Sequence, residues 1–200
     1  MKKLVHKAAA AALAVSILST GASALSHTVV RGDTMWKLAV KYQVGASEII
    51  GANPQISNPD LIYPGQTLTI PSVDGSVTAY ENEVVRLVND IRRQNGLSPL
   101  EANWELSRVA RYKSQDMADN RYFSHTSPTY GTPFQMIQAF GLSFRTAGEN
   151  IAYGQRTPQQ VVDGWMNSSG HRANILNAAY RQIGVGYVAG GNYWTQMFIG

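Results

Sequence analysis

The chain of 200 residues contains no cysteine. Disulfide bonds, thiolate nucleophiles and cysteine-bound metal ions are therefore excluded, and stability must come from packed apolar cores. Apolar residues make up 44% of the chain, which is enough to build one large domain or two small ones. The composition is that of an ordinary globular protein.

Charges are also sparse, because charged residues make up 15% of the chain and the formal net charge is +4. Three of the positive charges, Lys2, Lys3 and Lys7, stand at the start of the sequence, and without them the net charge falls to +1. Electrostatic capture of nucleic acid needs a concentrated basic face. We therefore expect no nucleic-acid partner.

No apolar run reaches the length of about 20 residues that a membrane-spanning helix needs. The run AAAAALAVSIL at residues 8–18 follows the early lysines and precedes Ala22-Ser23-Ala24. A basic start, a short apolar run and a small-x-small pattern are typical of a secretory signal peptide. We predict a signal peptide over residues 1–24 with cleavage after Ala24, and an uncleaved anchor is the alternative.

Export and the lack of cysteine together favour a location outside a bacterium that has no oxidising folding compartment. The mature chain is expected to be secreted and free of the membrane after cleavage. It divides into two units, residues 26–71 and residues 78–200. The small polar segment SVDGSV at residues 72–77 is predicted to be a flexible linker between them.

The first unit is predicted to have the order strand, helix, helix, strand. HTVV reads as the first strand, Thr34 or Asp33 can cap a helix that runs through Tyr42, and Ser47 can cap a second helix. TLTIP then reads as the closing strand. The predicted core consists of eight apolar residues: Val30, Trp36, Ala39, Val40, Ile49, Ile50, Leu68 and Ile70.

This unit resembles the LysM domain over nearly its whole length. The motifs V-x-x-GDT, the Trp-x-x-Ala helix, Asn-Pro after the second helix and the ending I-x-PGQ-x-L-x-I-P all occur in order. The resemblance implies a βααβ fold and binding to glycans that contain N-acetylglucosamine, such as peptidoglycan or chitin.

The resemblance also places a glycan-binding groove between two loops. Backbone amides and short polar side chains there can hydrogen-bond acetamido groups, while apolar side chains contact the sugar faces. Asp33, Thr34 and the Asn-Pro pair can equally serve only to cap and end helices. The implied glycan-binding residues are Gly32, Asp33, Thr34, Met35, Asn53, Pro54 and Ile56.

The second unit is predicted to be an α+β domain with helices packed on an antiparallel sheet. Helices are predicted over NEVVRLVNDIRRQNG, WELSRVARYKSQDMADN, PFQMIQAF and the segment from Thr157 to Trp165. IGVGYVA and YWTQMFI read as strands. We expect Trp165 and Trp194 to be core residues and Arg92 and Arg93 to lie on a solvated helix face.

Residues 81–200 resemble the CAP superfamily, which includes cysteine-rich secretory proteins, antigen 5 and pathogenesis-related 1 proteins. The motifs are N-x-x-R in the first helix, FSH, GENIA, W-x-x-S-x-x-HR-x-NIL, and IGVG followed by YWTQ-x-F. The match is to the cysteine-free bacterial branch. It implies an α-β-α sandwich with an open cleft, and the pairing with LysM resembles wall- or spore-associated proteins of endospore-forming bacteria.

Animal and plant members of that family line the cleft with two histidines and two glutamates. His125 and Glu149 match the first of each, whereas Ser168 and Tyr193 stand where the second glutamate and histidine are expected. His171, in the GHR motif, can bring a second imidazole to the same cleft. These substitutions put the metal site of the family in doubt.

Three interpretations of the cleft stay open. His125 and His171 could bind a divalent metal ion such as zinc, with Glu149 as a carboxylate ligand. The same three residues could perform metal-free acid–base catalysis, or they could be only structural, with Ser168 or Ser169 capping a helix. The chain offers no alternative nucleophile motif.

Two functions follow from these patterns. The first is a protein of the cell wall or spore envelope that binds peptidoglycan through the small unit and presents the CAP cleft to a protein or small-molecule ligand. The second is a wall-localised, metal-assisted hydrolase that uses the cleft. The sequence alone leaves open whether the protein is an enzyme.

Overall fold

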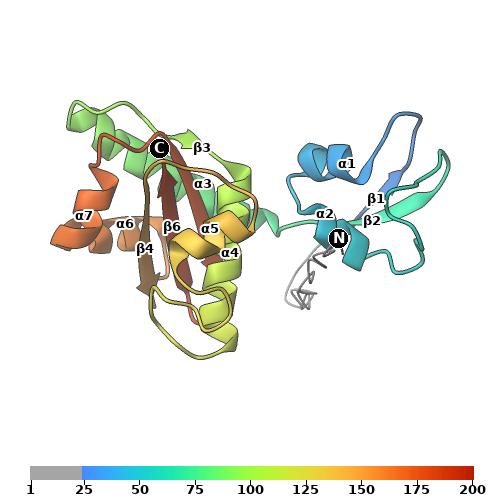
Figure 1. Ribbon diagram of the computed structural model, residues 1–200. Coiled ribbons are helices and arrows are strands. Elements are labelled where there is room, and N and C mark those ends of the chain that lie inside the picture. The colour runs from blue at the N-terminus through green and yellow to red at the C-terminus, as the bar shows by residue number, and fades with distance from the viewer. Residues whose placement is uncertain (1–23) are drawn as a thin grey trace, which may run out of the picture.

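The computed structural model describes residues 24–200, which fold into a small and a large domain (Figure 1). The predicted signal peptide lies outside the described residues except for Ala24, which begins the first strand. Cleavage after Ala24 would leave Leu25 to Thr28 of that strand in place. No helix in residues 24–200 combines the length and apolar character needed to cross a membrane.

The small domain has the predicted order of elements. It contains β1 (Ala24–Thr28), α1 (Met35–Tyr42), α2 (Ala46–Gly51) and β2 (Thr67–Pro71). The two strands are antiparallel, and His27 lies opposite Leu68. Thr34 caps α1 by accepting a hydrogen bond from the amide of Lys37. Ser47 is not the cap of α2, because that helix already begins at Ala46 after Gly45.

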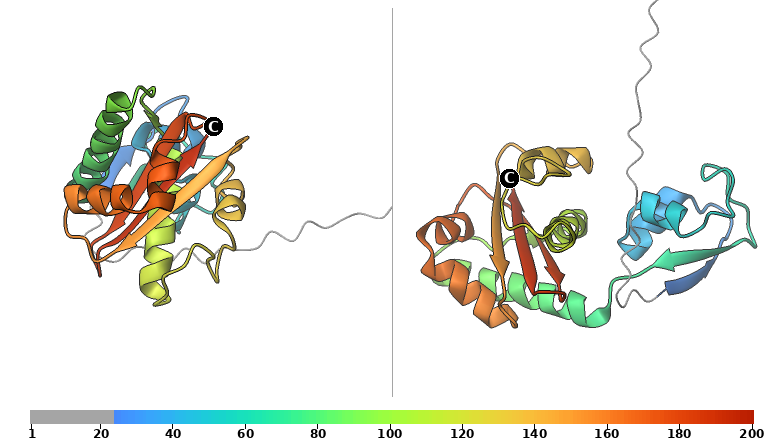
Figure 2. Two further views of the ribbon diagram at one scale, coloured as in Figure 1. Left: turned by 90° about the vertical axis from the view of Figure 1, so that its left-hand side faces the viewer. Right: turned by 90° about the horizontal axis from the view of Figure 1, so that it is seen from below.

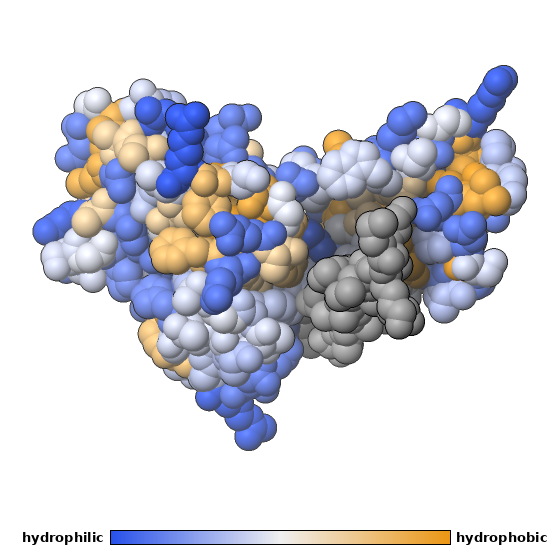
Figure 3. Space-filling view, viewed as in Figure 1, coloured by the Kyte–Doolittle hydropathy of each residue, from blue (hydrophilic) through white to orange (hydrophobic). Residues whose placement is uncertain are grey.

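Half of the predicted small core is wrong. Helix α1 buries Met35, Leu38 and Ala39, a stripe with the helical spacing i, i+3, i+4. Trp36 and Val40 each follow a residue of that stripe by one position, so they point about 100° away from it. The exposed residues among those predicted for the core are Val30, Trp36, Val40 and Ile50. Figure 3 shows apolar side chains on the surface of this domain.

The observed core of the small domain packs both helices onto the two-stranded sheet. It also includes Val29 and Val44, which flank β1 and α2 in sequence. The full set is Val29, Met35, Leu38, Ala39, Val44, Ile49, Leu68 and Ile70.

The large domain is an α-β-α sandwich, as predicted. It contains α3 (Gly75–Gln94), β3 (Glu101–Ala102), α4 (Trp104–Asp119), α5 (Pro133–Ala139), β4 (Ala147–Tyr153), α6 (Pro158–Asn167), α7 (Ser169–Ile175), β5 (Gln182–Val188) and β6 (Tyr193–Ile199). The strand order is β3-β5-β6-β4, with β3 parallel to β5 and the other pairs antiparallel. Helices α3, α6 and α7 cover one face of the sheet, and α4 and α5 cover the other (Figure 2).

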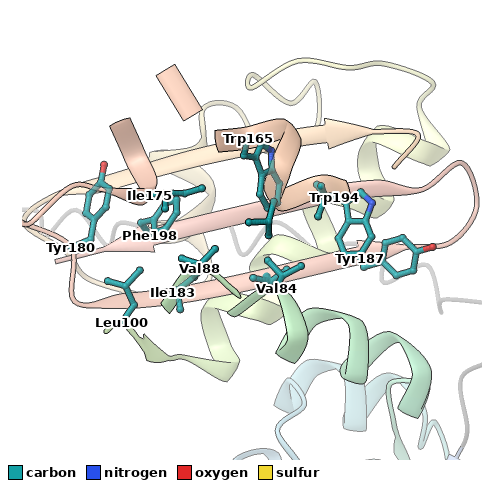
Figure 4. Close-up of a cluster of buried hydrophobic side chains, with 13 residues drawn as sticks. Val84, Val88, Leu100, Trp165, Ile175, Tyr180, Ile183, Tyr187, Trp194 and Phe198 are labelled. Carbon is teal, nitrogen blue, oxygen red and sulfur yellow. The ribbon is translucent and has the colours of Figure 1, made fainter. Parts of the chain in front are cut away.

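The large domain has one apolar core on each face of its sheet. Strand β6 contributes to both cores because its side chains point alternately to the two faces. Trp194 and Phe198 pack with α3 and α6, whereas Met197 and Ile199 pack with α4 and α5. Trp165 of α6 is buried in the first of these cores, as Figure 4 shows. The prediction that Trp165 and Trp194 are core residues is confirmed.

Arg92 does not lie on a solvated helix face. It is buried and donates hydrogen bonds to the carbonyl oxygens of Ser98, Ile175 and Asn177, at 2.9, 2.7 and 3.0 Å. Burial lowers the pKa of its guanidinium group. Arg93 is exposed as predicted and pairs with Asp90. Arg92 therefore ties α3 to the loop that follows α7.

The segment 72–77 is only partly a linker. Asp74 caps α3 by accepting a hydrogen bond from the Ser76 amide at 2.7 Å, so residues 75–77 form the first turn of the helix. The domains also touch directly. Glu48 of α2 accepts hydrogen bonds from the guanidinium of Arg108 and from the hydroxyl of Tyr112 at 2.8 Å, and both of these residues belong to α4.

Removing this contact is expected to let the small domain move. In Arg108→Ala the charged partner of Glu48 is lost, and a partly buried pair of this kind contributes about 1 kcal/mol. In the wild type the amide NMR relaxation rates of the two domains should fit one common tumbling time. In Arg108→Ala we expect the two domains to need different tumbling times. Arg86→Ala is the control, because Arg86 pairs only within α3. Unchanged relaxation in Arg108→Ala would contradict a contact that holds the domains together.

Candidate functional site

His125 and Glu149 meet beside strand β4. His125 lies in the loop between α4 and α5, and its Nδ1 is 2.7 Å from Oε1 of Glu149 in β4. The His125 side chain is 53% exposed and the Glu149 side chain only 2%. A buried carboxyl group therefore orients an accessible imidazole.

The environment of Glu149 favours its protonated form. Burial raises the pKa of Glu149, while the hydrogen bond with His125 and the charge of Lys113 oppose that rise. Its second oxygen, Oε2, is buried and has no hydrogen-bond partner in the described residues. A carboxyl group with a raised pKa and a free oxygen is chemically suited to exchange a proton.

His171 lies near this pair. It belongs to α7, and its backbone carbonyl accepts a hydrogen bond from the Asn150 side chain at 3.1 Å. Burial lowers the pKa of His171, and the nearby His125 lowers it further. Ser168 is the N-cap residue of α7, but its side chain makes no capping hydrogen bond. The structure thus brings His125, Glu149 and His171 together, and we call these three residues the His125 site.

Lys113 holds the loop that carries His125. It is buried, and its Nζ donates to the carbonyl oxygens of Ser124 at 2.7 Å and of His125 at 3.0 Å. Burial lowers the pKa of the Lys113 ammonium group. The sequence did carry a signal for this role, because Lys113 continues the apolar stripe of Val109 and Ala110 toward Met117.

Asp116 fixes the other half of the same loop. Its carboxylate accepts hydrogen bonds from Ser127 at 2.7 Å, Thr129 at 2.6 Å and Asn120 at 2.8 Å, and from the hydroxyl of Tyr122. Burial alone would raise the pKa of Asp116, but these hydrogen bonds outweigh it and the pKa is lowered.

Three amide side chains hold α7 against the edge of the sheet. Asn150 of β4 donates to Gln196 of β6 at 2.9 Å, and Asn174 of α7 donates to the Asn150 side chain at 2.8 Å. Asn174 also donates to the carbonyl oxygen of Glu149 at 3.1 Å. The network therefore sets the position of His171 relative to Glu149.

The donor set does not fit a metal centre with three protein ligands. In residues 24–200, no group of three or more His, Cys, Asp or Glu side chains is arranged to hold a metal ion. Glu149 Oε1 is already engaged with His125. The residues of this site therefore do not support a reaction assisted by zinc or another metal ion held by three protein ligands.

The residues predicted to bind glycan fall into two groups, those that are buried or bonded within the domain and those that are exposed. Met35 is buried in the small core, and Asn53 is buried and bonds the backbone of Thr69 in both directions, at 2.7 and 2.8 Å. Asp33 is bonded to His27 and to the Val30 amide. The members that remain exposed are Gly32, Thr34 and Pro54, while Ile56 packs partly against the core.

A cavity of about 710 Å³ lies between the two domains, away from the His125 site. Its walls come from α2, the segment 71–77, α4 and the turn after β5. Glu48 and Arg108, which line it, neutralise each other. None of the residues of the His125 site lines this cavity.

The chain is similar to proteins of known sequence and structure. "Uncharacterized protein YkwD" of Bacillus subtilis (strain 168) is 58% identical over 135 residues, which are 68% of this chain and 52% of YkwD. An extracellular protein containing an SCP domain from Bacillus anthracis str. Ames superposes with a TM-score of 0.60 at 35% identity, over 68% of this chain and 47% of that one. The chain thus spans about half the length of these relatives.

The small domain has relatives of its own. SpoIVD-associated factor A of Bacillus subtilis (strain 168) is 50% identical over 46 residues, which are 23% of this chain and 12% of that protein. Residues 27–71 match the LysM domain, and residues 85–198 match the cysteine-rich secretory protein family, abbreviated CAP. The chain therefore belongs to the CAP family and carries a LysM domain ahead of its CAP domain.

Proposed function

We propose that this is an exported protein of the cell wall or spore envelope that binds peptidoglycan through its LysM domain and presents the His125 site for recognition of a ligand. The observation that carries the proposal is the pairing, in one chain, of a LysM domain with an accessible imidazole held by a buried carboxyl group. The small domain is also 50% identical over 46 residues to "Spore coat assembly protein ExsA" of Bacillus cereus, and this similarity supports the spore envelope as one location.

Glycan recognition is assigned to the exposed loops of the LysM domain. Gly32 and Thr34 lie in the turn before α1, and Pro54 follows α2. With Met35 and Asn53 in the core, these exposed positions and the backbone amides of Gly32 and Thr34 carry the contact. A sugar can therefore bind at these positions without a change in the packed core of the domain.

Pro54→Glu is expected to weaken binding to purified peptidoglycan about tenfold, because the new carboxylate must lose water when a neutral glycan binds. Binding is measured by sedimentation of residues 25–200 with insoluble peptidoglycan. Pro99→Glu is the matched control, since Pro99 is an exposed proline of the CAP domain. Equal binding by the two variants would overturn the assignment to the LysM loops.

A second function, metal-free hydrolysis, is favoured by one observation. The free, buried Oε2 of Glu149 and the raised pKa of this carboxyl group are features of a general acid or base. In such a reaction the Glu149 carboxyl group and the His125 imidazole would exchange a proton across their 2.7 Å contact.

A further inference from the structure

Three aromatic side chains form a row on the surface of the CAP domain. The ring centroids of Phe123 and Tyr153 are 6.3 Å apart, and those of Tyr153 and Tyr193 are 4.6 Å apart. Phe123 and Tyr153 are 53% and 55% exposed. These residues, here called the aromatic row, come from the loop after α4, the end of β4 and the start of β6.

The backbone fixes the position of the row. Tyr153 and Tyr193 are register partners at one end of the sheet. Gly191, which precedes β6, has φ +94°, and a Cβ atom there would lie 2.8 Å from the ring of Tyr193 and 3.3 Å from that of Tyr153. The rings of Tyr153 and Tyr193 therefore lie against Gly191, a position of the turn that has no side chain.

The row is continuous with the His125 site. Phe123 precedes His125 by two residues in the same loop. Lys113 fixes this part of the loop by donating to the carbonyl oxygens of Ser124 and His125. In Figure 1 the loop after α4 runs beside the end of β4, where Tyr153 lies. A surface of three aromatic rings, tilted by 48° and 43° against each other, thus adjoins an accessible imidazole and a buried carboxyl group.

An uncharged sugar polymer matches this surface. The three rings carry no charge, and the tyrosine hydroxyls add hydrogen-bonding groups at their edges. A pyranose ring has an apolar face and a polar rim, so it can stack on such rings while its substituents reach polar groups nearby. Exposed aromatic side chains in mutual contact are typical of binding surfaces.

We propose that the aromatic row is a second glycan-binding surface, which stacks N-acetylhexosamine rings of the wall polymer and leads the strand to the His125 site. This inference rests on the proposed function, because the polymer is the one assigned to the LysM domain. Two weak sites on one chain that bind the same polymer raise the overall affinity without any further contact.

An NMR titration of residues 25–200 with the β-1,4-linked tetramer of N-acetylglucosamine tests the proposal. We expect two separate groups of amide shifts, one around Gly32 and Pro54 and one around the aromatic row. The double variant Phe123→Ala/Tyr153→Ala should weaken binding at the row about tenfold and leave the LysM shifts unchanged. Phe134→Ala is the control, since Phe134 is an exposed ring outside the row.

The outcomes separate the two proposals. Shifts confined to the LysM loops, and unchanged in the double variant, would overturn the aromatic row while leaving the proposed function intact. No shifts in either domain would overturn both. If a wall stem peptide without sugar shifts the row and the tetramer does not, the row recognises peptide and the glycan assignment is wrong.

Discussion

Gly186→Ala is expected to destabilise the CAP domain by roughly 3 kcal/mol. Helix α4 crosses β5 so closely that a Cβ atom at Gly186 would overlap the backbone of Ala110 and Arg111. Backbone atoms of a packed helix cannot rotate away as the end of a side chain can, so the helix must lift from the sheet. Urea unfolding of residues 25–200 measures the loss.

Gly190→Ala is the matched control. Gly190 lies just after the same strand, and a Cβ atom there would meet nothing within 4 Å. We expect its free energy of unfolding to stay within about 0.5 kcal/mol of the wild type. If both variants lost the same stability, the close approach of α4 and β5 would not be the reason for glycine in the IGVG segment.

Asp116→Ala is expected to cost about 3 kcal/mol and to release the loop that carries His125. The change removes a buried carboxylate and leaves the hydroxyl groups of Ser127 and Thr129 without their acceptor. Urea unfolding gives the loss of stability, and the NMR signals of His125 report the freed loop. Asp119→Ala is the control, because Asp119 is exposed and accepts a hydrogen bond only from Gln115.

The effect of Asp116 on stability should depend on pH in a defined direction. Its pKa is lower in the folded protein than the value of about 3.9 for an unfolded chain. Its stabilisation is therefore present above that value and is lost as the pH falls through the folded pKa. Below pH 4 the difference between wild type and Asp116→Ala should shrink, and a difference that stays constant to pH 2 would contradict the role given to the carboxylate.

Local patterns predicted the elements of the fold better than they predicted which faces are buried. The order of elements in the small domain follows from hydrophobic periodicity and capping residues, whereas strands β3 and β4 of the large domain were not predicted. In α1, however, two apolar stripes compete, and Trp36 is a larger residue than Met35 or Leu38. Only packing against the sheet selects the stripe that becomes the core.

The hydrogen-bond partners of two buried cations could not be predicted from the sequence for a related reason. Arg92 and Lys113 stand on helices where a cation usually faces water. Backbone carbonyl oxygens converge on both of them, that of Ile175 on Arg92 and that of Ser124 on Lys113. Such acceptors belong to the tertiary structure, since residues 92 and 175 are far apart in the chain.

The candidate site was predictable only in part. His125, Glu149 and His171 were found from motifs, and the structure does bring them together. The amides of Asn150 and Gln196 belong to the same motifs, but their bond across two paired strands needs the register of the sheet. The sequence left a metal ion open as one of three interpretations, and the described residues offer no group of three ligands.

The central proposal is that the chain binds peptidoglycan through its LysM domain and presents the His125 site to a ligand. The direct test incubates residues 25–200 with purified peptidoglycan and measures both the protein in the pellet and the fragments in solution. We predict protein in the pellet and no fragments, for the wild type and for Glu149→Gln alike. Fragments released by the wild type but not by Glu149→Gln would contradict the claim and make the His125 site a catalytic centre.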